Sequence, residues 1–356
     1  MSDQIKKSIQ TLDTSDMLSK ILEFPDQILR GWDIAGEARV LIDFHKHEHV
    51  MFCGMGGSAI AGDIVRLLYA QDIPIPFVVH RGYRLPGFVD SQSLFIASSY
   101  SGNTEETLTS TNAAVDAGCS IICITSGGRL MAMAQEKGYP VCSLPTGYPP
   151  RGALGYSLGV LFRLFNQADI EAASQKTIEE AVSFIKKTGE DWIKTHTGDC
   201  LPLRLAETIK GKLPLIYSSV ERTEAVGLRW KAQFNENSKT HAFYQPFPEM
   251  NHNEIMGWNG PSGTQPFYPH LIMLLLRDPE DSSRIGLRMD VTKQLLEASG
   301  AEVLEVWAQG PSILSRILYF IYLGDLVSFY LAMLYGVNPT EIQNIDRLKK
   351  ELARSS

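Results

Sequence analysis

Short apolar runs alternate along the chain with longer segments that carry apolar residues at helical spacing. The short runs predict strands, and apolar residues three or four positions apart predict helices. In the first half, strands are expected at 50–53, 76–80, 93–97, 120–125 and 140–144. Helices are expected between them at 59–69, 105–117 and 131–137. This alternation predicts a parallel sheet with helices on both faces.

The same alternation restarts near residue 213, after a series of helices. Helical patterns cover residues 1 to about 35, with a break at Pro25, and then 154–166 and 175–195, which follow a rigid loop at 145–151. Later strands are expected at 213–218, 241–244, 270–276 and 302–307, and helices at 225–237, 284–299, 313–335 and 340–352. The prediction is an α/β protein of two doubly wound halves, with domains at 1–195 and 196–356.

One predicted helix, 313–335, is apolar and long enough to cross a membrane. Arg316 and the Gly324-Asp325 pair interrupt its apolar character. A buried core helix is therefore the better interpretation.

Composition narrows the class of protein. Of the 356 residues, 44% are hydrophobic and 21% charged, which is typical of a globular protein, and the length suits two domains. A net charge of −7 argues against a non-specific nucleic-acid binder or a binder of anionic membranes. Five cysteines without CxxC spacing indicate reduced thiols, and the polar N-terminus has no signal core. A cytoplasmic protein with no nucleic-acid or membrane partner is expected.

The sequence SSYSGNT at 98–104 joins a predicted strand to a predicted helix and is rich in hydroxyls. It offers Ser99, Ser101 and Thr104, with Gly102 for a tight bend. Hydroxyls and free backbone N–H groups at a helix start form an anion site. The alternative is that these residues only cap the helix and shape the turn.

A second turn at 54–59 has the pattern GxGxxA directly after a strand, as in dinucleotide-binding proteins. Dinucleotide-binding proteins with this pattern carry an acidic residue at the end of the next strand, where this chain has His80-Arg81. NAD is therefore disfavoured, and NADP remains an alternative. A sugar phosphate at the carboxyl ends of the strands explains both turns. Its phosphate would be bound by Gly57, Ser58, Ser99, Ser101 and Thr104.

Seven motifs extend this interpretation over nearly the whole chain. In chain order they are GMGGSAIAGD, SSYSGNTEET, PPRGALGYSLG, FNENSK, PEMNHNEI, YLGDLVSFYLA and IDRLKKEL. In this order they resemble the bacterial and archaeal bifunctional phosphoglucose/phosphomannose isomerases, which have the sugar isomerase (SIS) fold. The resemblance implies two SIS-type halves, no cofactor and a homodimer. It also implies an aldose–ketose isomerisation of glucose 6-phosphate and mannose 6-phosphate to fructose 6-phosphate through a cis-enediol.

The resemblance also implies the roles of individual residues. Glu236 is the base that moves a proton between C1 and C2, and Arg151 stabilises the enediolate. His252 assists ring opening and reaches the neighbouring subunit's site. Taken alone, the three residues would be a helix-end acid, a loop arginine and a structural histidine. A metal site of His252 with Glu249 and Glu254 is disfavoured, because HExxH spacing is absent.

Ring opening in the family also uses a lysine near the C-terminus, where Lys349 and Lys350 compete. The last helix carries an apolar stripe of Ile342, Ile345, Leu348 and Leu352, which is expected to be buried. Lys349 lies nearer this stripe and is the preferred candidate. A solvated surface charge is the plain alternative for either lysine.

Two other classes of protein stay open at this stage, a non-catalytic SIS-type sugar-phosphate sensor and an NADP-dependent oxidoreductase. The sensor would need none of Glu236, Arg151, His252 and Lys349, and the presence of all four argues against it. Glucosamine 6-phosphate remains open as a substrate. Gln343 and the region of Thr340 are candidates for the rotation about C2–C3 that accepting both sugars requires.

Overall fold

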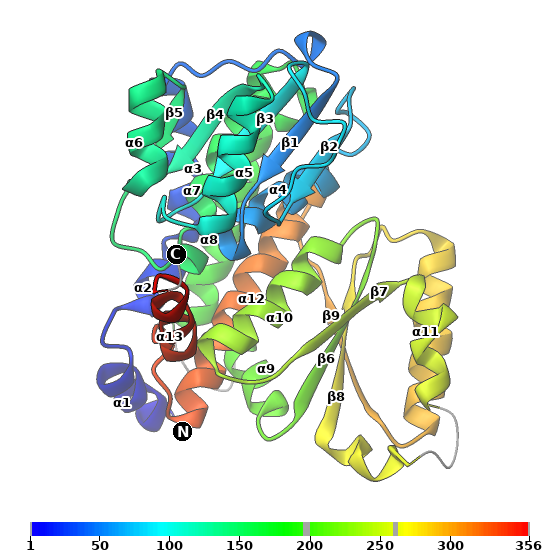
Figure 1. The fold of residues 1–356 in the computed structure, drawn as a ribbon. Coiled ribbons are helices and arrows are strands. Elements are labelled where there is room, and N and C mark those ends of the chain that lie inside the picture. Colours follow the sequence, from blue (N-terminus) through cyan, green and yellow to red (C-terminus); the bar gives the residue numbers. More distant parts are fainter. Residues whose placement is uncertain (1, 195–199, 259–262, 355–356) are drawn as a thin grey trace.

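A computed structural model describes residues 2–194, 200–258 and 263–354. It contains two parallel sheets, one from each half of the chain, with helices packed between and around them (Figure 1). The two predicted α/β halves are therefore confirmed. The proposed domain boundary between residues 195 and 196 lies outside the described residues.

The first sheet has the strand order β2-β1-β3-β4-β5, and all neighbours are parallel. Its strands are β1 (His49–Cys53), β2 (Phe77–His80), β3 (Ser93–Ser98), β4 (Ser120–Thr125) and β5 (Val141–Ser143). The helices that connect them are α4 (Gly56–Leu68), α5 (Glu105–Asp116) and α6 (Gly128–Lys137). The order reverses between the neighbours β1 and β3, and both predicted anion turns leave the sheet at this point. In open parallel sheets this is where ligands bind.

The second sheet repeats the pattern with the order β7-β6-β8-β9, again parallel throughout. Its strands are β6 (Leu213–Ser219), β7 (Phe243–Phe247), β8 (Leu271–Arg277) and β9 (Glu302–Trp307). Helices α9 (Leu201–Ile209), α10 (Glu224–Asn237) and α11 (Ser283–Ala298) accompany them. Helix α9 was not expected from the sequence pattern. The strand expected at 241–244 begins two residues later, at Phe243.

The remaining helices are α1 (Ser2–Leu12), α2 (Met17–Leu22), α3 (Phe24–Glu37), α7 (Leu154–Gln167), α8 (Gln175–Ile193), α12 (Ile313–Tyr335) and α13 (Gln343–Leu352). Pro25 lies in the first turn of α3, so it begins that helix instead of interrupting one. Its missing N–H costs nothing at this position, because the first N–H groups of a helix have no partner within the helix.

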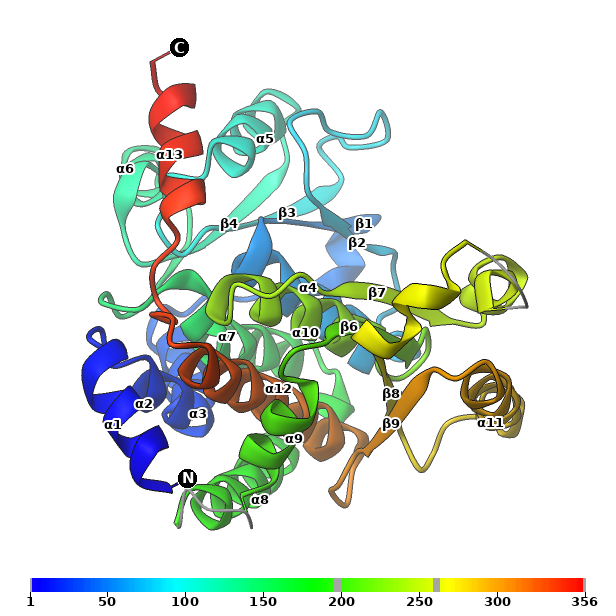
Figure 2. The same cartoon turned by 90° about the horizontal axis from the view of Figure 1, so that it is seen from below.

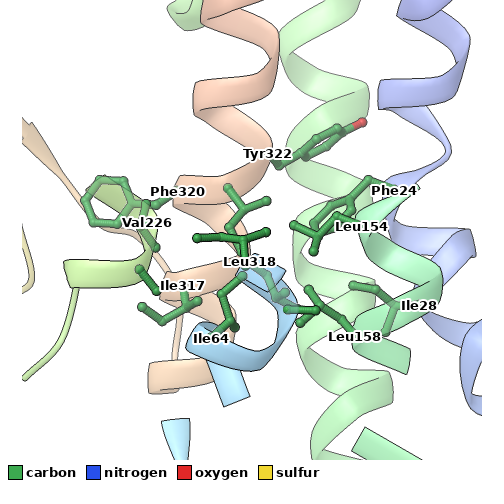
Figure 3. Packing of buried hydrophobic residues seen from close by; sticks show 14 of the residues in the cluster. Phe24, Ile28, Ile64, Leu154, Leu158, Val226, Ile317, Leu318, Phe320 and Tyr322 are labelled. Atoms are coloured by element: carbon green, nitrogen blue, oxygen red, sulfur yellow. The ribbon is translucent and has the colours of Figure 1, made fainter. Parts of the chain in front are cut away.

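Helix α12 is the central element of the core. It has the length and hydropathy of a membrane span, yet every residue from 314 to 333 is buried inside the protein. Figure 3 shows its Ile317, Leu318 and Phe320 packed among residues of both halves. Those neighbours include Ile28 of α3, Ile64 of α4, Leu154 and Leu158 of α7 and Val226 of α10. The interpretation as a buried core helix is confirmed, and α12 joins the two halves through one shared core.

Helix α13 differs from the sequence-based expectation. None of its residues is buried, and Ile345, Leu348 and Leu352 are 39%, 59% and 44% exposed. The helix projects from one edge of the molecule (Figure 2). The prediction of a buried stripe in the last helix is therefore wrong for this single chain. Periodicity identifies the apolar face of a helix, but it does not show whether the same chain supplies a surface to cover that face.

Candidate active site

The two anion turns lie against each other at the carboxyl edge of the first sheet. Ser58, in the first turn of α4, accepts a hydrogen bond from the backbone N–H of Tyr100 through its hydroxyl at 3.1 Å. Ser99 and Thr104 share a hydrogen bond of 2.9 Å between their hydroxyls, and Thr104 is the N-cap residue of α5. The structure thus gathers hydroxyls from both turns beside two helix N-termini, an arrangement suited to phosphate.

The bend of the second turn requires glycine at position 102. Gly102 has a φ of +66°, in the left-handed region, and a Cβ atom there would collide with the carbonyl oxygen of Gly127. The exposed Ser101 hydroxyl accepts from the backbone N–H of Asn103 at 3.2 Å. Ser101 therefore lies on the open side of the turn, unlike the buried Ser99.

The first turn also positions the predicted arginine. A Cβ atom on Gly57 would lie 2.9 Å from the carbonyl oxygen of Pro150 and 3.1 Å from the Cα of Arg151. Glycine therefore lets the start of α4 pack directly on the short 3-10 helix Pro150–Gly152. The loop before Arg151 is held by Tyr100, whose hydroxyl donates to the carbonyl of Pro145 at 2.7 Å.

The guanidinium of Arg151 is buried and held from several directions. Its Nε donates to Oδ1 of Asn237 at 2.6 Å, and its Nη2 donates to the carbonyls of Pro339 and Thr340 at 2.6 and 3.0 Å. Its Nη1 donates to Oε2 of Glu236 at 3.2 Å. Burial lowers the pKa of Arg151, and the neighbouring Glu236 carboxylate opposes that effect. Since a guanidinium keeps its proton in proteins, this is a fixed positive charge beside a carboxylate.

A second layer of buried polar groups supports Arg151 from behind. Arg229 of α10 donates through Nη2 to the carbonyl of Arg151 at 2.9 Å, and its Nε and Nη2 bind the Asp325 carboxylate at 3.0 and 2.6 Å. Gln233, one turn further along α10, donates to Asp325 at 2.7 Å. Asn237 donates to the hydroxyl of Ser328 at 2.9 Å. Burial raises the pKa of Asp325, while the paired Arg229 lowers it. The polar residues of α12 thus orient the arginine in the site.

Glu236 faces a cavity of about 730 Å³ between the end of α10 and residues 336–345. Its side chain is 30% exposed, whereas that of Arg151 is 3% exposed, so the carboxylate is the accessible member of the pair. The volume lies in the range of small-molecule sites and is sufficient for a hexose phosphate. Gln343, a candidate for the C2–C3 rotation, is among the lining residues.

Comparison with known proteins supports this picture. Residues 201–352 match the family model described as the bacterial phospho-glucose isomerase C-terminal SIS domain. The chain is 39% identical over 338 residues to a bifunctional phosphoglucose/phosphomannose isomerase of Caldicellulosiruptor bescii, with 95% of this chain and 99% of the relative covered. A bifunctional phosphoglucose/phosphomannose isomerase of Aquifex aeolicus is 37% identical over 88% of this chain and 92% of its own length.

The chain belongs to the bifunctional phosphoglucose/phosphomannose isomerase family. A D-glucosamine-6-phosphate 4-epimerase of Sulfolobus acidocaldarius is also similar, at 33% identity over 85% of this chain and 89% of its own. Among solved structures, a hypothetical protein of Thermus thermophilus matches with a TM-score of 0.78 at 14% identity over 99% of this chain and 93% of its own. A tagatose-6-phosphate ketose/aldose isomerase of Escherichia coli matches with a TM-score of 0.70 at 14% identity, over 91% and 94%. These structures support the SIS fold.

The structure brings only some of the family's expected residues together. Arg151 and Glu236 form an ion pair, and Arg151 packs on the turn that carries Gly57 and Ser58. His252 does not join them within this chain. It is exposed at the end of the 3-10 helix Glu249–His252. Along the chain, the whole of β7 separates it from Glu236. A strand of five residues such as β7 is about 15 Å long.

The two candidate lysines also lie apart from the cavity. Lys349 and Lys350 are both exposed on α13, and neither is among the residues that line the cavity of Glu236. The choice between them therefore stays a prediction. The apolar stripe beside them, which was the reason for preferring Lys349, is exposed as well.

Sequence reasoning missed several residues of the site. Asn237 and Lys239 lie within FNENSK, beside Glu236, and their polar side chains in that motif were the available signal. Arg229 and Asp325 could have been suspected as charged residues on otherwise apolar helix faces. Conversely, Arg81 forms an ion pair with Asp63 of α4, so its charge is already matched within the chain. That pairing weakens the NADP alternative.

Proposed function

We propose that this protein is an aldose–ketose isomerase that interconverts glucose 6-phosphate and mannose 6-phosphate with fructose 6-phosphate. The observation that carries the proposal is the Glu236–Arg151 ion pair: Glu236 borders a cavity of hexose-phosphate size, and Arg151 packs on the turn that carries Gly57 and Ser58. The names of the relatives from C. bescii and A. aeolicus support the same pair of substrates.

In the proposed reaction, Glu236 takes the proton from C2 of the open-chain aldose and returns it to C1, while the proton of the O2 hydroxyl passes to O1. Between these steps the sugar is a cis-enediolate, whose negative charge is met by the fixed guanidinium of Arg151. Glucose 6-phosphate and mannose 6-phosphate differ only at C2, so both give the same intermediate. Because the charge is held in position before the reaction, little reorganisation is required.

The phosphate holds the sugar in position at a distance from the reacting carbons. In the proposal, the hydroxyls of Ser58, Ser99, Ser101 and Thr104 bind it together with the backbone of Gly57 and Ser58. Binding energy at this remote group fixes C1 and C2 against the base and thereby raises the rate of the chemical step.

Ring opening is assigned to His252 and Lys349, with Lys350 as the alternative lysine. The exposed position of His252 beyond β7 supports a homodimer in which this histidine serves the neighbour's cavity. The exposed apolar stripe of α13 is likewise available to a partner subunit. We further propose that the enzyme is cytoplasmic and acts in glycolysis and gluconeogenesis, where these sugar phosphates are interconverted.

The test is a coupled assay that follows fructose 6-phosphate formed from glucose 6-phosphate and, separately, from mannose 6-phosphate. Glu236→Gln keeps the shape of the side chain but removes the base, so both activities should fall at least about 1000-fold, with folding and phosphosugar binding retained. Turnover of glucose 6-phosphate alone would show that mannose 6-phosphate is not a substrate. Binding without turnover by folded wild type would favour a sensor.

The relative from S. acidocaldarius supports one further candidate, a reaction on glucosamine 6-phosphate. The same protein preparation should therefore be incubated with glucosamine 6-phosphate and its products separated by chromatography. Formation of a 4-epimer, with no fructose 6-phosphate from glucose 6-phosphate or mannose 6-phosphate, would replace the isomerase with an epimerase.

A further inference from the structure

Lys239 is the lysine that the structure places at the cavity of Glu236. It follows α10 by two residues, and its Nζ turns back to donate to the carbonyl of Glu236 at 2.7 Å and to that of Asn237 at 3.4 Å. Lys239 also lines the cavity, together with Glu236 and Gln343. The ammonium group is thus held at the wall of the cavity where Glu236 is accessible.

The backbone of Lys239 adopts an uncommon conformation to achieve this. Its φ is +56°, in the left-handed region, where side chains other than glycine and asparagine are disfavoured. Such positions end many helices, and they also occur at functional sites, where a side chain is held against its own preference. A simple capping role would explain the bonds to the two carbonyls.

The charges around Lys239 distinguish it from a simple helix cap. Positive charge at a helix C-terminus is normally stabilised, which raises the pKa of a lysine there. Partial burial and the neighbouring Arg151 instead lower the pKa of Lys239 to about 8, although Glu341 and Glu236 act in the opposite direction. His241 lines the same cavity. Two cations therefore lie at Glu236: Arg151 is paired with its carboxylate, and Lys239 is bonded to its backbone carbonyl.

We infer that Lys239 contacts the sugar in this cavity and supplies, beside Arg151, a second positive charge for the enediolate oxygens. The inference rests on the proposed isomerase function and deepens it. No bond is made or broken at the lysine in this role, because the ammonium acts only by its charge and its hydrogen bonds. Arg151 keeps its charge at any working pH, whereas Lys239 loses its proton as the pH rises through about 8. The loss should weaken catalysis above that pH.

The experiment compares Lys239→Met, Lys239→Gly and Lys239→Arg with wild type. Loss of one group that stabilises an oxyanion lowers kcat about 100-fold, so we expect that loss in the Met and Gly variants, with KM changed far less. Lys239→Arg keeps the charge and should stay within about threefold of wild type. Its activity should also persist to higher pH, because the guanidinium does not titrate there.

Lys239→Gly separates charge from capping. Glycine suits a φ of +56°, so this variant should fold at least as stably as wild type, as judged by thermal unfolding. Lys231→Met serves as the matched control, since Lys231 lies on the same helix and does not line the cavity.

Several outcomes would overturn the inference. Wild-type kcat in a stable Lys239→Gly variant would show that the lysine only caps the helix. If the activity of Lys239→Arg falls at the same high pH as that of wild type, the charge of Lys239 does not contribute to catalysis. In both cases an inactive Glu236→Gln would leave the isomerase itself standing. No turnover of either sugar phosphate by folded wild type would overturn the isomerase and the role of Lys239 together.

Discussion

The carboxyl edges of the two sheets share one topology, but the hydroxyl groups at the two edges have different hydrogen-bond partners. In each half the order of strands reverses beside the first strand of the sheet, β1 or β6, and a short turn leads from that strand into a helix. The second half also carries hydroxyls there: Ser218 and Ser219 end β6, Thr223 ends the turn, and all three are fully buried. By topology alone, both edges would be candidate ligand sites.

At the second edge, a carboxylate of the protein itself accepts a hydrogen bond from a serine hydroxyl. The hydroxyl of Ser219 donates to Oδ1 of Asp281 at 2.7 Å, and the backbone N–H of Ser219 donates to Thr223 at 2.8 Å. Asp278 is paired with Arg316 at 2.9 Å. At the first edge, by contrast, Ser99 and Thr104 bond to each other and Ser58 accepts from a backbone N–H. Because the Ser219 hydroxyl already donates its one hydrogen to a carboxylate, it has none left for a phosphate, so the fold alone does not make the site.

The largest effect is expected from Gly102→Ala, at the first edge. The new methyl group would collide with the carbonyl of Gly127 and would also force a strained φ of +66°. We expect the free energy of unfolding to fall by about 3 kcal/mol or more, with the sugar-phosphate activity lost. Chemical denaturation measures the first quantity and the coupled assay the second.

Gly211→Ala is the matched control for this variant. Gly211 has a similar φ of +83°, but an added Cβ there meets no atom of the described residues within 4 Å. Only the backbone strain remains, which costs about 1 kcal/mol. Equal destabilisation by the two substitutions would show that the close packing around Gly102 contributes nothing.

A second, intermediate effect should separate the two edges directly. Ser99→Ala removes a hydroxyl that is proposed to bind phosphate, so KM should rise about tenfold, a loss typical of one hydrogen bond to a charged group. Ser219→Ala, at the second edge, should leave KM unchanged and lower the free energy of unfolding by about 1–3 kcal/mol, because Oδ1 of the buried Asp281 loses its hydrogen bond. Steady-state kinetics and urea unfolding on both variants provide the comparison.

The opposite result would reverse the assignment of the two edges. A rise in KM for Ser219→Ala, with no change for Ser99→Ala, would place the phosphate at the second sheet. Inorganic phosphate can be added as an independent probe, since it should raise the unfolding temperature of wild type more than that of Ser99→Ala.

The smallest effect concerns the pKa of Asp281. Burial raises this pKa, and the hydrogen bond from Ser219 partly offsets the rise by stabilising the charged form. Ser219→Ala should therefore raise the pKa of Asp281 further. An NMR titration of the carboxyl carbon measures the shift, and a lower pKa in the variant would contradict the bonding described here.

Much of the fold could be predicted from the sequence because the signals are local. The strand at 120–125 and the helix at 313–335 have the predicted limits, since a continuous apolar run fits only a buried element. Helix α9 and the start of β7 were less predictable. The residues there carry mixed polarity, and packing decides their conformation.

The residues of the candidate site also fall into two groups, those that the sequence could predict and those that it could not. Glu236 and Arg151 were identified from motifs, and the structure brings them within 3.2 Å. Their supporting groups could not be read from local pattern. Arg151 is bonded to Asn237, 86 positions away along the chain, and to the carbonyl of Pro339, 188 positions away. Nothing within either segment signals its partner.

By itself, the sequence determined the two α/β halves, the two anion turns and the family, because periodicity, glycine positions and short motifs act over a few residues. Only the tertiary structure decided which side chains meet. It turned Lys239 into the cavity of Glu236, kept His252 beyond β7 and left the apolar face of α13 uncovered. These outcomes depend on distant segments packing together, and the free energy of that packing belongs to the whole chain and not to any one stretch.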